Sequence, residues 1–479
     1  MGTKHRKNLS HRHKVALFLG DLWILVVLLT HTPPAEGRPQ AAQNNGTSSS
    51  VPRFGAHEYA YVSSWPILDR TLGSVTAVAI DGAGNVVIFH RGSHVWSLET
   101  FDQKDVYQDA AGGPIANHTV LKFTHDTGSL LQEWGANLFY MPHGLTIDHE
   151  QNYWLTDVAL HQVFKFDLNH STTEPVLTLG TRFEPGNDMY HYCKPTAVAV
   201  LKSGEFFVAD GYCNGRIVKY SPEGVPILAW GRNSFVLTRT FDLGPGPVPV
   251  NFFAVPHALT VVPDRDLLCV ADREQGRVQC FHTGNATFHS QYSSPEMGSR
   301  LFSVKYISSD GGLLYTINGP ELNLVFNSVV PVGGFILEMD SGKVVGRFQP
   351  NNPRHAFSNP HELAVLDDGS EVYVAELNPQ MVHKFRLVSA PRPSATTPRP
   401  TVARNEGENT SKDHYYAGGQ PGMSSALTAG SIGIFSIVST LIVTSLLVIL
   451  MARVICVRSG QGASRTDEMP LRNMAVDEG

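Results

Sequence analysis

The sequence repeats one short phrase three times, as Pro142-His143-Gly144-Leu145, Pro256-His257-Ala258-Leu259 and Pro360-His361-Glu362-Leu363. Each copy opens a stretch of alternating apolar residues, and a fourth copy, Pro195-Thr196-Ala197-Val198, carries threonine in place of histidine. The prolines at 142, 195, 256 and 360 are 53, 61 and 104 residues apart. The last interval therefore holds two periods of about 52 residues, a spacing typical of repeat architectures.

Each period contains the pattern of two β-hairpins made of short apolar strands. Copies of this pattern begin near Val75, Leu145, Ala197, Leu259, Phe302 and Glu362. Six copies of four short strands predict an all-β fold, a six-bladed β-propeller, in which closure of the ring supplies the core. We expect Glu58 to Trp65 to supply the strand that closes the ring with the last blade. An open two-sheet sandwich is the alternative, and the long period argues against it.

The N-terminal segment has the features of a targeting sequence. Met1 to Lys14 is basic, Val15 to Leu29 is mostly apolar, and Ala35-Glu36-Gly37 offers small residues for cleavage. This order predicts a secretory signal peptide over residues 1–37, with an uncleaved anchor as the alternative. Residues 38–55 are polar, and we expect them to be disordered.

The C-terminal segment predicts a membrane anchor. Residues 389–425 are rich in Pro, Ser and Thr and are expected to form a stalk. No charged residue occurs between Asp413 and Arg453, so residues 426–452 are long and apolar enough for one transmembrane helix. Arg453 and Arg458 then place residues 453–479 in the cytoplasm. Cys456, beside the membrane, is either palmitoylated or a free thiol.

These ends predict a single-pass type I membrane protein of the secretory pathway or cell surface, with residues 56–388 lumenal or extracellular. Five Asn-x-Ser/Thr sequons fit that side of the membrane: Asn45, Asn117, Asn169, Asn285 and Asn409. Four of the five cysteines lie in this oxidising compartment, so we expect two disulfides. The net charge is −6 and the body has no long basic block, which excludes nucleic acid as an expected partner.

The turns that follow the second strand of each unit carry further candidate residues. The first two strands of a unit form an antiparallel hairpin, so the start of the first lies beside the end of the second. We therefore expect Arg91, Tyr212 and Arg273 on the same rim as the three histidines, directed toward the central axis. The acidic residues of these turns are expected to be structural and to accept backbone N–H bonds: Asp157, Asp210 and Asp272.

Three histidines at one repeat position favour a metal site, although a single such histidine is more often only hydrogen-bonded. Three neutral imidazoles with an open fourth position are typical of catalytic zinc. A cysteine as fourth ligand would instead make a closed structural site. Cys193 and Cys213, however, flank one blade junction, and Cys269 and Cys280 face each other across a hairpin. Disulfides in these two pairs are the simpler prediction.

Several longer stretches resemble one enzyme family. They are Phe89–Trp96, Met141–Leu145, Tyr153–Lys165, Asp210–Asn214, Val255–Leu259 and Ala271–Glu274. Together they resemble peptidyl-α-hydroxyglycine α-amidating lyase over about residues 56–388. The resemblance implies an NHL-like six-bladed propeller, and it pairs the four cysteines as above.

The resemblance also implies two metal sites. Zinc would be bound by His143, His257 and His361. A structural calcium would be bound by the backbone carbonyls of Val78 and Leu145 and by the carboxylate of Glu362. The family has aspartate at the last position and tends to have methionine at the position of Asn359. A longer carboxylate can still ligate calcium.

The reaction implied by the resemblance cleaves the N–Cα bond of a C-terminal peptidyl-α-hydroxyglycine. The products are a peptide amide and glyoxylate, which makes this the second step of peptide C-terminal amidation, as in neuropeptide processing. Zinc would activate the substrate hydroxyl. Tyr212 would act as general base if an arginine lowers its pKa. One arginine would clamp the substrate carboxylate, and the sequence leaves open whether that is Arg91 or Arg273.

Related bifunctional proteins carry a copper monooxygenase before the lyase, whereas about 20 residues separate the predicted signal peptide from the propeller here. We therefore expect a stand-alone lyase that receives its peptide substrates from a separate copper monooxygenase. A non-enzymatic extracellular propeller that binds protein partners is the alternative function. A calcium-dependent lactonase-type hydrolase is a second alternative, but it would need a centre rich in carboxylates and asparagine.

Overall fold

The computed structural model describes residues 57–68, 70–234, 248–321, 330–351 and 355–389. The predicted signal peptide, polar segment, transmembrane helix and tail lie outside the described residues, as does the stalk beyond residue 389. In the part of the chain that is described, no helix is long and apolar enough to cross a membrane. The predicted all-β class is confirmed there, because the helices are single 3₁₀ turns: η1 (Ala110–Gly112), η2 (Pro263–Arg265), η3 (Arg273–Gln275), η4 (Pro295–Met297) and η5 (Ser309–Gly311).

Four sheets of four strands follow one another along the chain. The first contains β2 (Val75–Ile80), β3 (Val86–His90), β4 (Val120–Phe123) and β5 (Leu130–Trp134). The second contains β6 (Pro142–Ile147), β7 (Tyr153–Asp157), β8 (Gln162–Phe166) and β9 (Leu177–Leu179). The third contains β10 (Pro195–Val200), β11 (Phe206–Asp210), β12 (Arg216–Tyr220) and β13 (Pro226–Trp230). The fourth contains β16 (Pro256–Val262), β17 (Leu267–Asp272), β18 (Arg277–His282) and β19 (Phe288–Tyr292).

The remaining strands form one larger sheet and one short parallel pair. The larger sheet has the order β20 (Leu301–Ile307), β21 (Leu313–Asn318), β22 (Gly334–Glu338), β23 (Val344–Phe348), β1 (His57–Val62), β26 (Met381–Ser389), β25 (Glu371–Glu376), β24 (Pro360–Val365). The short pair joins β14 (Arg232–Asn233) to β15 (Phe252–Phe253).

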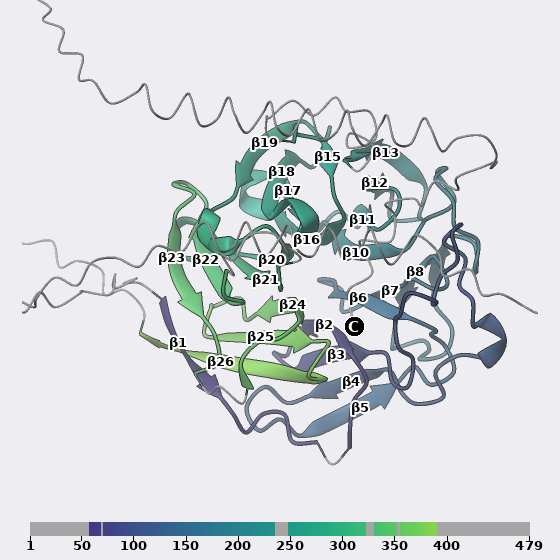
Figure 1. Ribbon diagram of the computed structural model, residues 1–479, viewed down its shortest axis with the longest axis horizontal. Coiled ribbons are helices and arrows are strands. Elements are labelled where there is room, and N and C mark those ends of the chain that lie inside the picture. Colours follow the sequence, from purple (N-terminus) through teal and green to yellow (C-terminus); the bar gives the residue numbers. More distant parts are fainter. Residues whose placement is uncertain (1–56, 69, 235–247, 322–329, 352–354, 390–479) are drawn as a thin grey trace, which may run out of the picture. The chain divides into compact units, whose positions relative to one another are not determined.

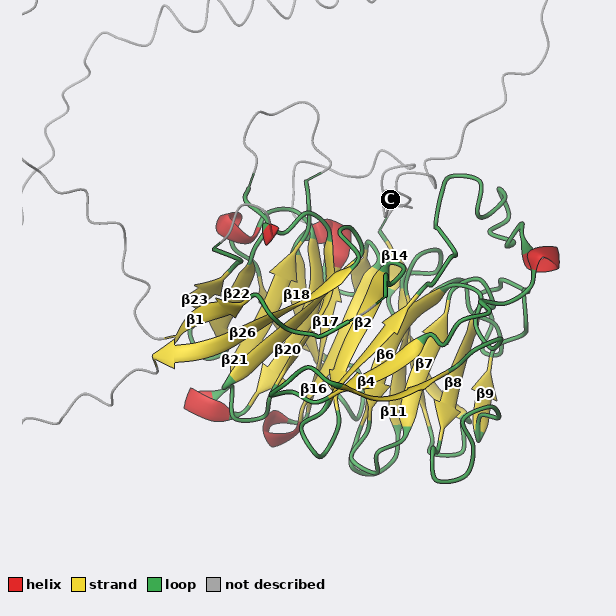
Figure 2. Cartoon of the chain, turned by 90° about the horizontal axis from the view of Figure 1, so that it is seen from below, coloured by secondary structure: helices red, strands yellow, loops and turns green. Residues whose placement is uncertain are grey.

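The first strands of the sheets lie side by side around a common centre. β2 contacts β6, β6 contacts β10, and the series continues through β16, β20 and β24 back to β2. Figure 1 looks along this centre, and Figure 2 shows the strands running between two layers of loops. Apolar side chains are buried between neighbouring sheets, as where Leu145 and Leu155 pack with Val87 and Phe89. The arrangement is propeller-like.

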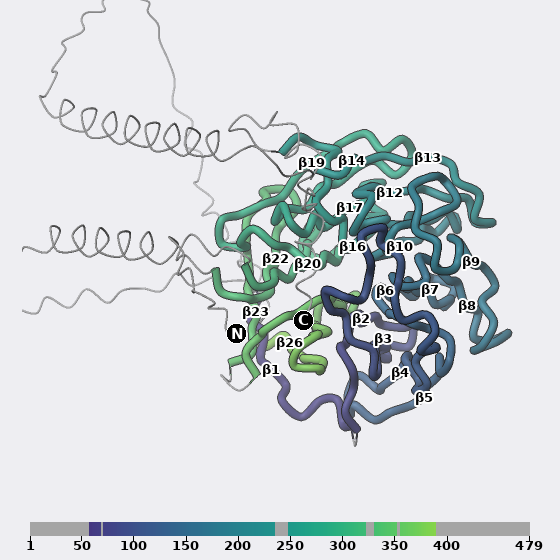
Figure 3. The backbone as a smooth tube through the Cα atoms, turned by 45° about the vertical axis from the view of Figure 1, so that its right-hand side comes forward, coloured from purple at the N-terminus to yellow at the C-terminus, as the bar shows by residue number. Residues whose placement is uncertain are grey.

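The N-terminal strand closes the ring, as the sequence predicts. β1 pairs antiparallel with β26, from Glu58 opposite Ser389 to Val62 opposite Lys384. Figure 3 shows these two ends of the described chain side by side. β1 also meets β23 in a short parallel contact, which explains why two four-stranded units merge into one larger sheet.

Every first strand is irregular near its start. The register shifts there by one extra residue relative to the second strand in all six cases, as in a β-bulge. A bulge re-aims a side chain and lets it leave the ordinary alternation of the sheet. The residues at the shift are all completely buried: Thr76, His143, Thr196, His257, Phe302 and His361. The repeated histidine is therefore the bulge residue of alternate units around the ring.

Candidate active site

Three histidines from β6, β16 and β24 converge at the centre of the ring. The ring centroid of His143 lies 4.8 Å from that of His257 and 4.7 Å from that of His361, and the latter two are 4.5 Å apart. Their potential ligand nitrogens all lie within 4.8 Å of one another, and all three side chains are buried. This donor set could hold one metal ion.

The carbonyl groups of the intervening units fix the protonation of these histidines. Nδ1 of His143 lies 2.9 Å from the carbonyl oxygen of Thr196. Nδ1 of His257 lies 2.7 Å from that of Phe302, and Nδ1 of His361 lies 2.6 Å from that of Thr76. Because a carbonyl only accepts, each Nδ1 carries a proton, so in the neutral ring the lone pair is on Nε2. Three neutral imidazoles with convergent Nε2 atoms fit zinc.

These carbonyl groups are not apparent from the side-chain pattern of the sequence. Each acceptor is the bulge residue of the next unit, so histidine units alternate with units that orient them. The fourth copy of the motif, with Thr196 in place of histidine, was the one sequence feature that indicated units of a second kind. Gly144 assists the close approach of β6 to β10, because a Cβ there would lie 2.2 Å from the Thr196 oxygen.

Tyr212 stands beside the histidines, in the turn after β11. Its hydroxyl oxygen lies 3.0 Å from Nε2 of His143 and accepts a hydrogen bond from the Arg273 guanidinium at 3.1 Å. Since Nδ1 of His143 holds the ring proton, the phenol donates to Nε2. The Arg273 guanidinium also lies 5.0 Å from the centre of the Tyr212 ring. A buried phenol thus contacts both a potential metal ligand and a cation.

Arg273 is held by a charge network in the turn after β17. Its Nε donates to Glu274 at 2.7 Å, and Arg300 donates to both oxygens of the same carboxylate. Burial raises the pKa of Glu274, but the charges of Arg273 and Arg300 outweigh this and hold it below its usual value. Arg273 is completely buried, so the network keeps a desolvated cation in one orientation.

Arg91 reaches the same region from the turn after β3. Its Nε donates to the carbonyl oxygen of Pro142 at 3.1 Å, directly before His143. Its guanidinium lies 5.0 Å from the centre of the Trp96 ring, which in turn lies 5.0 Å from the Tyr212 ring. The structure therefore brings Arg91, Tyr212 and Arg273 to one rim with the histidines. Trp96 was not among the residues that the repeat pattern predicts for this rim.

The carboxylates of these turns accept backbone N–H bonds, as expected. Asp157 accepts from Tyr140, Met141, Ala159 and Leu160 at 2.7 to 3.0 Å. Asp210 accepts from the backbone of Cys193, and Asp272 accepts from that of Ala254. These acids bind the connecting segment that leads into each first strand to the end of the second strand.

The residues expected to hold calcium line a cavity of about 480 Å³ farther along the first strands. Val78, Leu145 and Glu362 all contribute to its wall. Glu362 accepts a hydrogen bond from the Ser303 hydroxyl at 2.9 Å, and burial raises the pKa of its carboxyl to about 8. A carboxylate beside strand carbonyls suits calcium. The cavity also contains Lys305, which the sequence analysis did not consider.

The disulfides join the cysteines in the expected pairs. Cys193, just before β10, is bonded to Cys213, just after β11, and Cys269 is bonded to Cys280 on the paired strands β17 and β18. Three sequon residues lie among the described residues, and all are exposed: Asn117, Asn169 and Asn285. Asn45 and Asn409 lie outside the described residues.

Known proteins share the repeat and most of this sequence. The NHL repeat model matches residues 192–220 and 253–281. Peptidyl-alpha-hydroxyglycine alpha-amidating lyase 2 of Drosophila melanogaster is 40% identical over 347 residues, which cover 70% of this chain and 77% of that protein. The chain belongs to the peptidyl-α-hydroxyglycine α-amidating lyase family.

Two further members show how the family's lengths differ. Lyase 1 of Drosophila melanogaster is 52% identical over 337 residues, 70% of this chain and 61% of that protein. Peptidyl-glycine alpha-amidating monooxygenase A of Xenopus laevis is 44% identical over 324 residues, 67% of this chain and 33% of that protein. This chain therefore spans less than two thirds of the length of either relative.

Proposed function

We propose that this chain is a zinc-dependent lyase that cleaves the N–Cα bond of C-terminal peptidyl-α-hydroxyglycine, releasing a peptide amide and glyoxylate. The observation that carries the proposal is the convergence of three neutral imidazoles with the hydroxyl of Tyr212, which lies 3.0 Å from Nε2 of His143. Family membership supplies the substrate class, because relatives along 67% to 70% of this chain carry the name of this lyase or of an amidating monooxygenase.

The scaffold of this site is proposed to be a six-bladed propeller. The closed series of first strands, β2, β6, β10, β16, β20 and β24, supports one blade for each. The larger sheet then counts as two blades that β1 joins, since β1 pairs with β26 and touches β23. An even number of blades allows histidine units to alternate with orienting units around the ring.

Zinc would be held by Nε2 of His143, His257 and His361, and when bound it would lower the pKa of a coordinated substrate hydroxyl. Tyr212 is proposed as the general base that accepts the hydroxyl proton. A phenol ordinarily titrates near pH 10. The Arg273 guanidinium, 3.1 Å from its oxygen, favours the phenolate and so prepares Tyr212 to take a proton.

Arg91 is proposed to bind the substrate carboxylate. Arg273 contacts Glu274 and the Tyr212 hydroxyl, which favours it as the partner of the base, and Arg91 reaches the rim beside Trp96 with its Nε bound to the Pro142 carbonyl. A guanidinium suits two-pronged binding of a carboxylate. This division assigns one arginine to the base and the other to the substrate.

Proton transfer then balances the reaction. The substrate hydroxyl loses its proton to Tyr212, the carbon–oxygen double bond of glyoxylate forms, and the bond between Cα and the peptide nitrogen breaks. The nitrogen takes up one proton and leaves as the terminal amide. Tyr212 can return the proton it received, so no net proton is consumed.

Calcium is proposed as a structural ion held by the carbonyls of Val78 and Leu145 and the carboxylate of Glu362. The shared cavity supports this assignment. The chain is further proposed to be a type I membrane glycoprotein that is anchored through one helix in the secretory pathway. It would receive hydroxylated peptides from a separate copper monooxygenase.

A direct assay tests the proposal. The full-length chain is incubated with a peptide that ends in α-hydroxyglycine, glyoxylate is measured, and bound zinc is determined by elemental analysis. We expect glyoxylate and peptide amide in equal amounts, and zinc at one ion per chain. A folded protein that carries zinc but releases no glyoxylate would overturn the proposal.

A further inference from the structure

The rim loop, residues 92–118 between β3 and β4, covers the proposed base. Its Trp96 is 3% exposed, packs 5.0 Å from the Tyr212 ring, and lies beneath the Arg91 guanidinium. One indole thus contacts both the proposed base and the proposed carboxylate-binding group. Trp96 is the residue through which the rim loop meets the reaction site.

The indole N–H of Trp96 is buried and has no hydrogen-bond partner among the described residues. A buried donor left without an acceptor costs about 1 to 3 kcal/mol. Buried polar groups in native proteins are nearly always paired, so each exception requires an explanation. Beside a site for an acidic substrate, the simplest explanation is that the substrate supplies the acceptor.

An ion pair holds this part of the rim loop in place. Nζ of Lys194, the residue just before β10, lies 3.0 Å from a carboxylate oxygen of Asp105. The two side chains are 9% and 16% exposed, so the pair is shielded from water. The same ammonium lies 4.1 Å from the centre of the Phe101 ring and 5.8 Å from that of Trp96.

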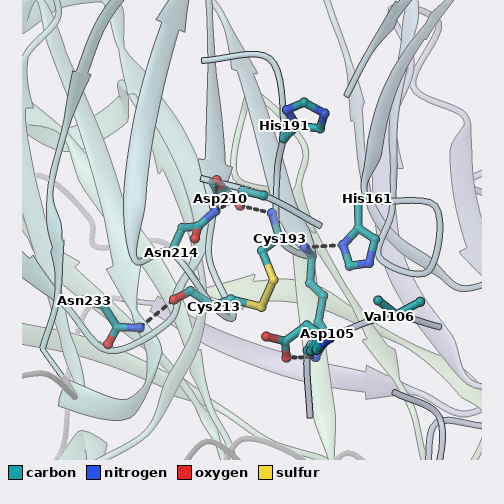
Figure 4. Close-up of a disulfide and its surroundings, with 12 residues drawn as sticks. Asp105, Val106, His161, His191, Cys193, Asp210, Cys213, Asn214 and Asn233 are labelled. Atoms are coloured by element: carbon teal, nitrogen blue, oxygen red, sulfur yellow. Dashed lines mark hydrogen bonds and ion pairs between the residues drawn. A yellow bond between two sulfur atoms is a disulfide. The ribbon is translucent and has the colours of Figure 1, made fainter. Parts of the chain in front are cut away.

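The turn that carries Lys194 is held in place by a hydrogen bond and a disulfide. The backbone N–H of Lys194 donates to Nδ1 of His161 at 3.0 Å. The preceding residue, Cys193, is bonded to Cys213, which directly follows Tyr212. Figure 4 shows Asp105 beside this disulfide, with His161 on the same side. The turn that carries Lys194 is therefore tied covalently to the turn that carries Tyr212.

We propose that Trp96 is a substrate-positioning residue whose indole N–H donates to the bound peptidyl-α-hydroxyglycine. The Lys194–Asp105 ion pair holds the rim loop so that this donor stays against Tyr212 and Arg91. The inference rests on the proposed function for its substrate. To the site residues that the repeat supplies, it adds a hydrogen-bond donor on the rim loop. It also adds the ion pair that holds this donor in position.

Trp96→Phe tests the donor, because phenylalanine keeps an aromatic ring and removes the N–H. We expect KM for an N-acyl-α-hydroxyglycine substrate to rise about tenfold, with a smaller change in kcat and normal zinc content. An unchanged KM in the folded, zinc-loaded variant overturns the donor role.

Lys194→Met tests the ion pair, since methionine keeps the apolar stem of lysine and removes the charge. We expect a loss in kcat/KM of about tenfold or more, because small misplacements at a reaction site are costly. Lys194→Arg should restore most of this loss. The double variant with Trp96→Phe should be little worse than the worse single variant, because both changes remove the same contact. If the kcat/KM losses of the two single variants multiply in the double variant, Lys194 does not act through Trp96, and the proposal is overturned.

Lys219→Met is the matched control. Lys219 also pairs with a carboxylate at 3.0 Å, that of Glu205, and its ammonium lies 5.8 Å from the Phe207 ring, but it belongs to β12. Its loss should lower stability and leave KM unchanged.

Hydrogen exchange gives a readout that needs no substrate. Lys194→Met should increase exchange in residues 92–118. Unaltered exchange there would show that the Lys194–Asp105 ion pair does not hold the rim loop, whether or not the chain is a lyase.

Discussion

The two ends of the ring of first strands present polar groups in different ways. At the bulge end, each histidine is oriented by a hydrogen bond from its Nδ1 to the backbone carbonyl of a neighbouring strand. At the other end, Glu362 and Lys305 line one cavity as potential opposite charges. Burial raises the pKa of Glu362 to about 8, although Ser303 and Lys305 act against it. The histidine end is fixed by main-chain geometry, whereas the state of the acidic end depends on protons and cations.

The comparison is tested most strongly at the histidine end, with His257→Ala. Removing one of three zinc ligands should abolish tight zinc binding and reduce glyoxylate release below detection. Elemental analysis of the purified variant measures the first effect. His191→Ala, which changes a half-buried histidine in a loop away from the three histidines, should retain full zinc. Full zinc occupancy in the His257 variant would exclude that ligand assignment.

Tyr212→Phe separates the chemistry from the metal. The histidines keep their carbonyl partners, so zinc content should stay normal, while kcat should fall by about 10² to 10⁴ because the general base is lost. Steady-state kinetics and zinc analysis of the same sample provide both numbers. Turnover at the level of the unchanged protein would remove Tyr212 from the reaction.

Removal of calcium tests the end of the ring that contains Glu362, and it should lower the thermal stability of the protein. The folded-state pKa of Glu362 lies above its usual value of 4.5, so without a cation its contribution to stability is full below pH 4.5 and declines toward pH 8. Calcium needs the ionised form, and it should therefore raise the Tm more at pH 8.5 than at pH 6.5. Thermal unfolding with calcium or with a chelator measures this difference. Equal shifts at both pH values would contradict Glu362 as the ligand.

Lys305→Met should produce the smallest effect of the four changes, and it should strengthen calcium binding instead of weakening it. Ser303 and Lys305 are two residues apart on β20 and share a face, and Ser303 contacts Glu362. Removing the ammonium should strengthen calcium binding several-fold, because a positive charge in the same cavity repels the ion. Calorimetric titration measures the affinity, and Lys202→Met, at an exposed position, is the control. Weaker calcium binding in the Lys305 variant would show that this lysine supports the site.

Much of the fold follows from the sequence because a repeat imposes its own geometry. The phrase at Pro142, Pro256 and Pro360 marks the first residue of three first strands, and strand pairing then predicts the shared rim of Arg91, Tyr212 and Arg273. The all-β class and the closing role of the segment at Glu58 follow in the same way. Period and pairing are local rules, and they apply to every copy.

The features that the sequence did not reveal lie outside those rules. Trp96, Asp105 and Lys194 meet because an irregular loop folds over a neighbouring sheet, and no periodic pattern records that path. The carbonyl acceptors of Thr76 and Phe302 are backbone groups, so side-chain identity does not indicate them. Lys305 faces the cavity through the alternation of β20, but only the three-dimensional ring brings it near Glu362.

The pairing of β1 with β26 has a consequence for synthesis. Among the described strands, His57–Val62 leaves the ribosome first, and its antiparallel partner, Met381–Ser389, is made last. His361, the third of the central histidines, belongs to the same sheet as this pair. A chain that stops before residue 381 therefore leaves β1 without its antiparallel partner and exposes an unpaired strand edge.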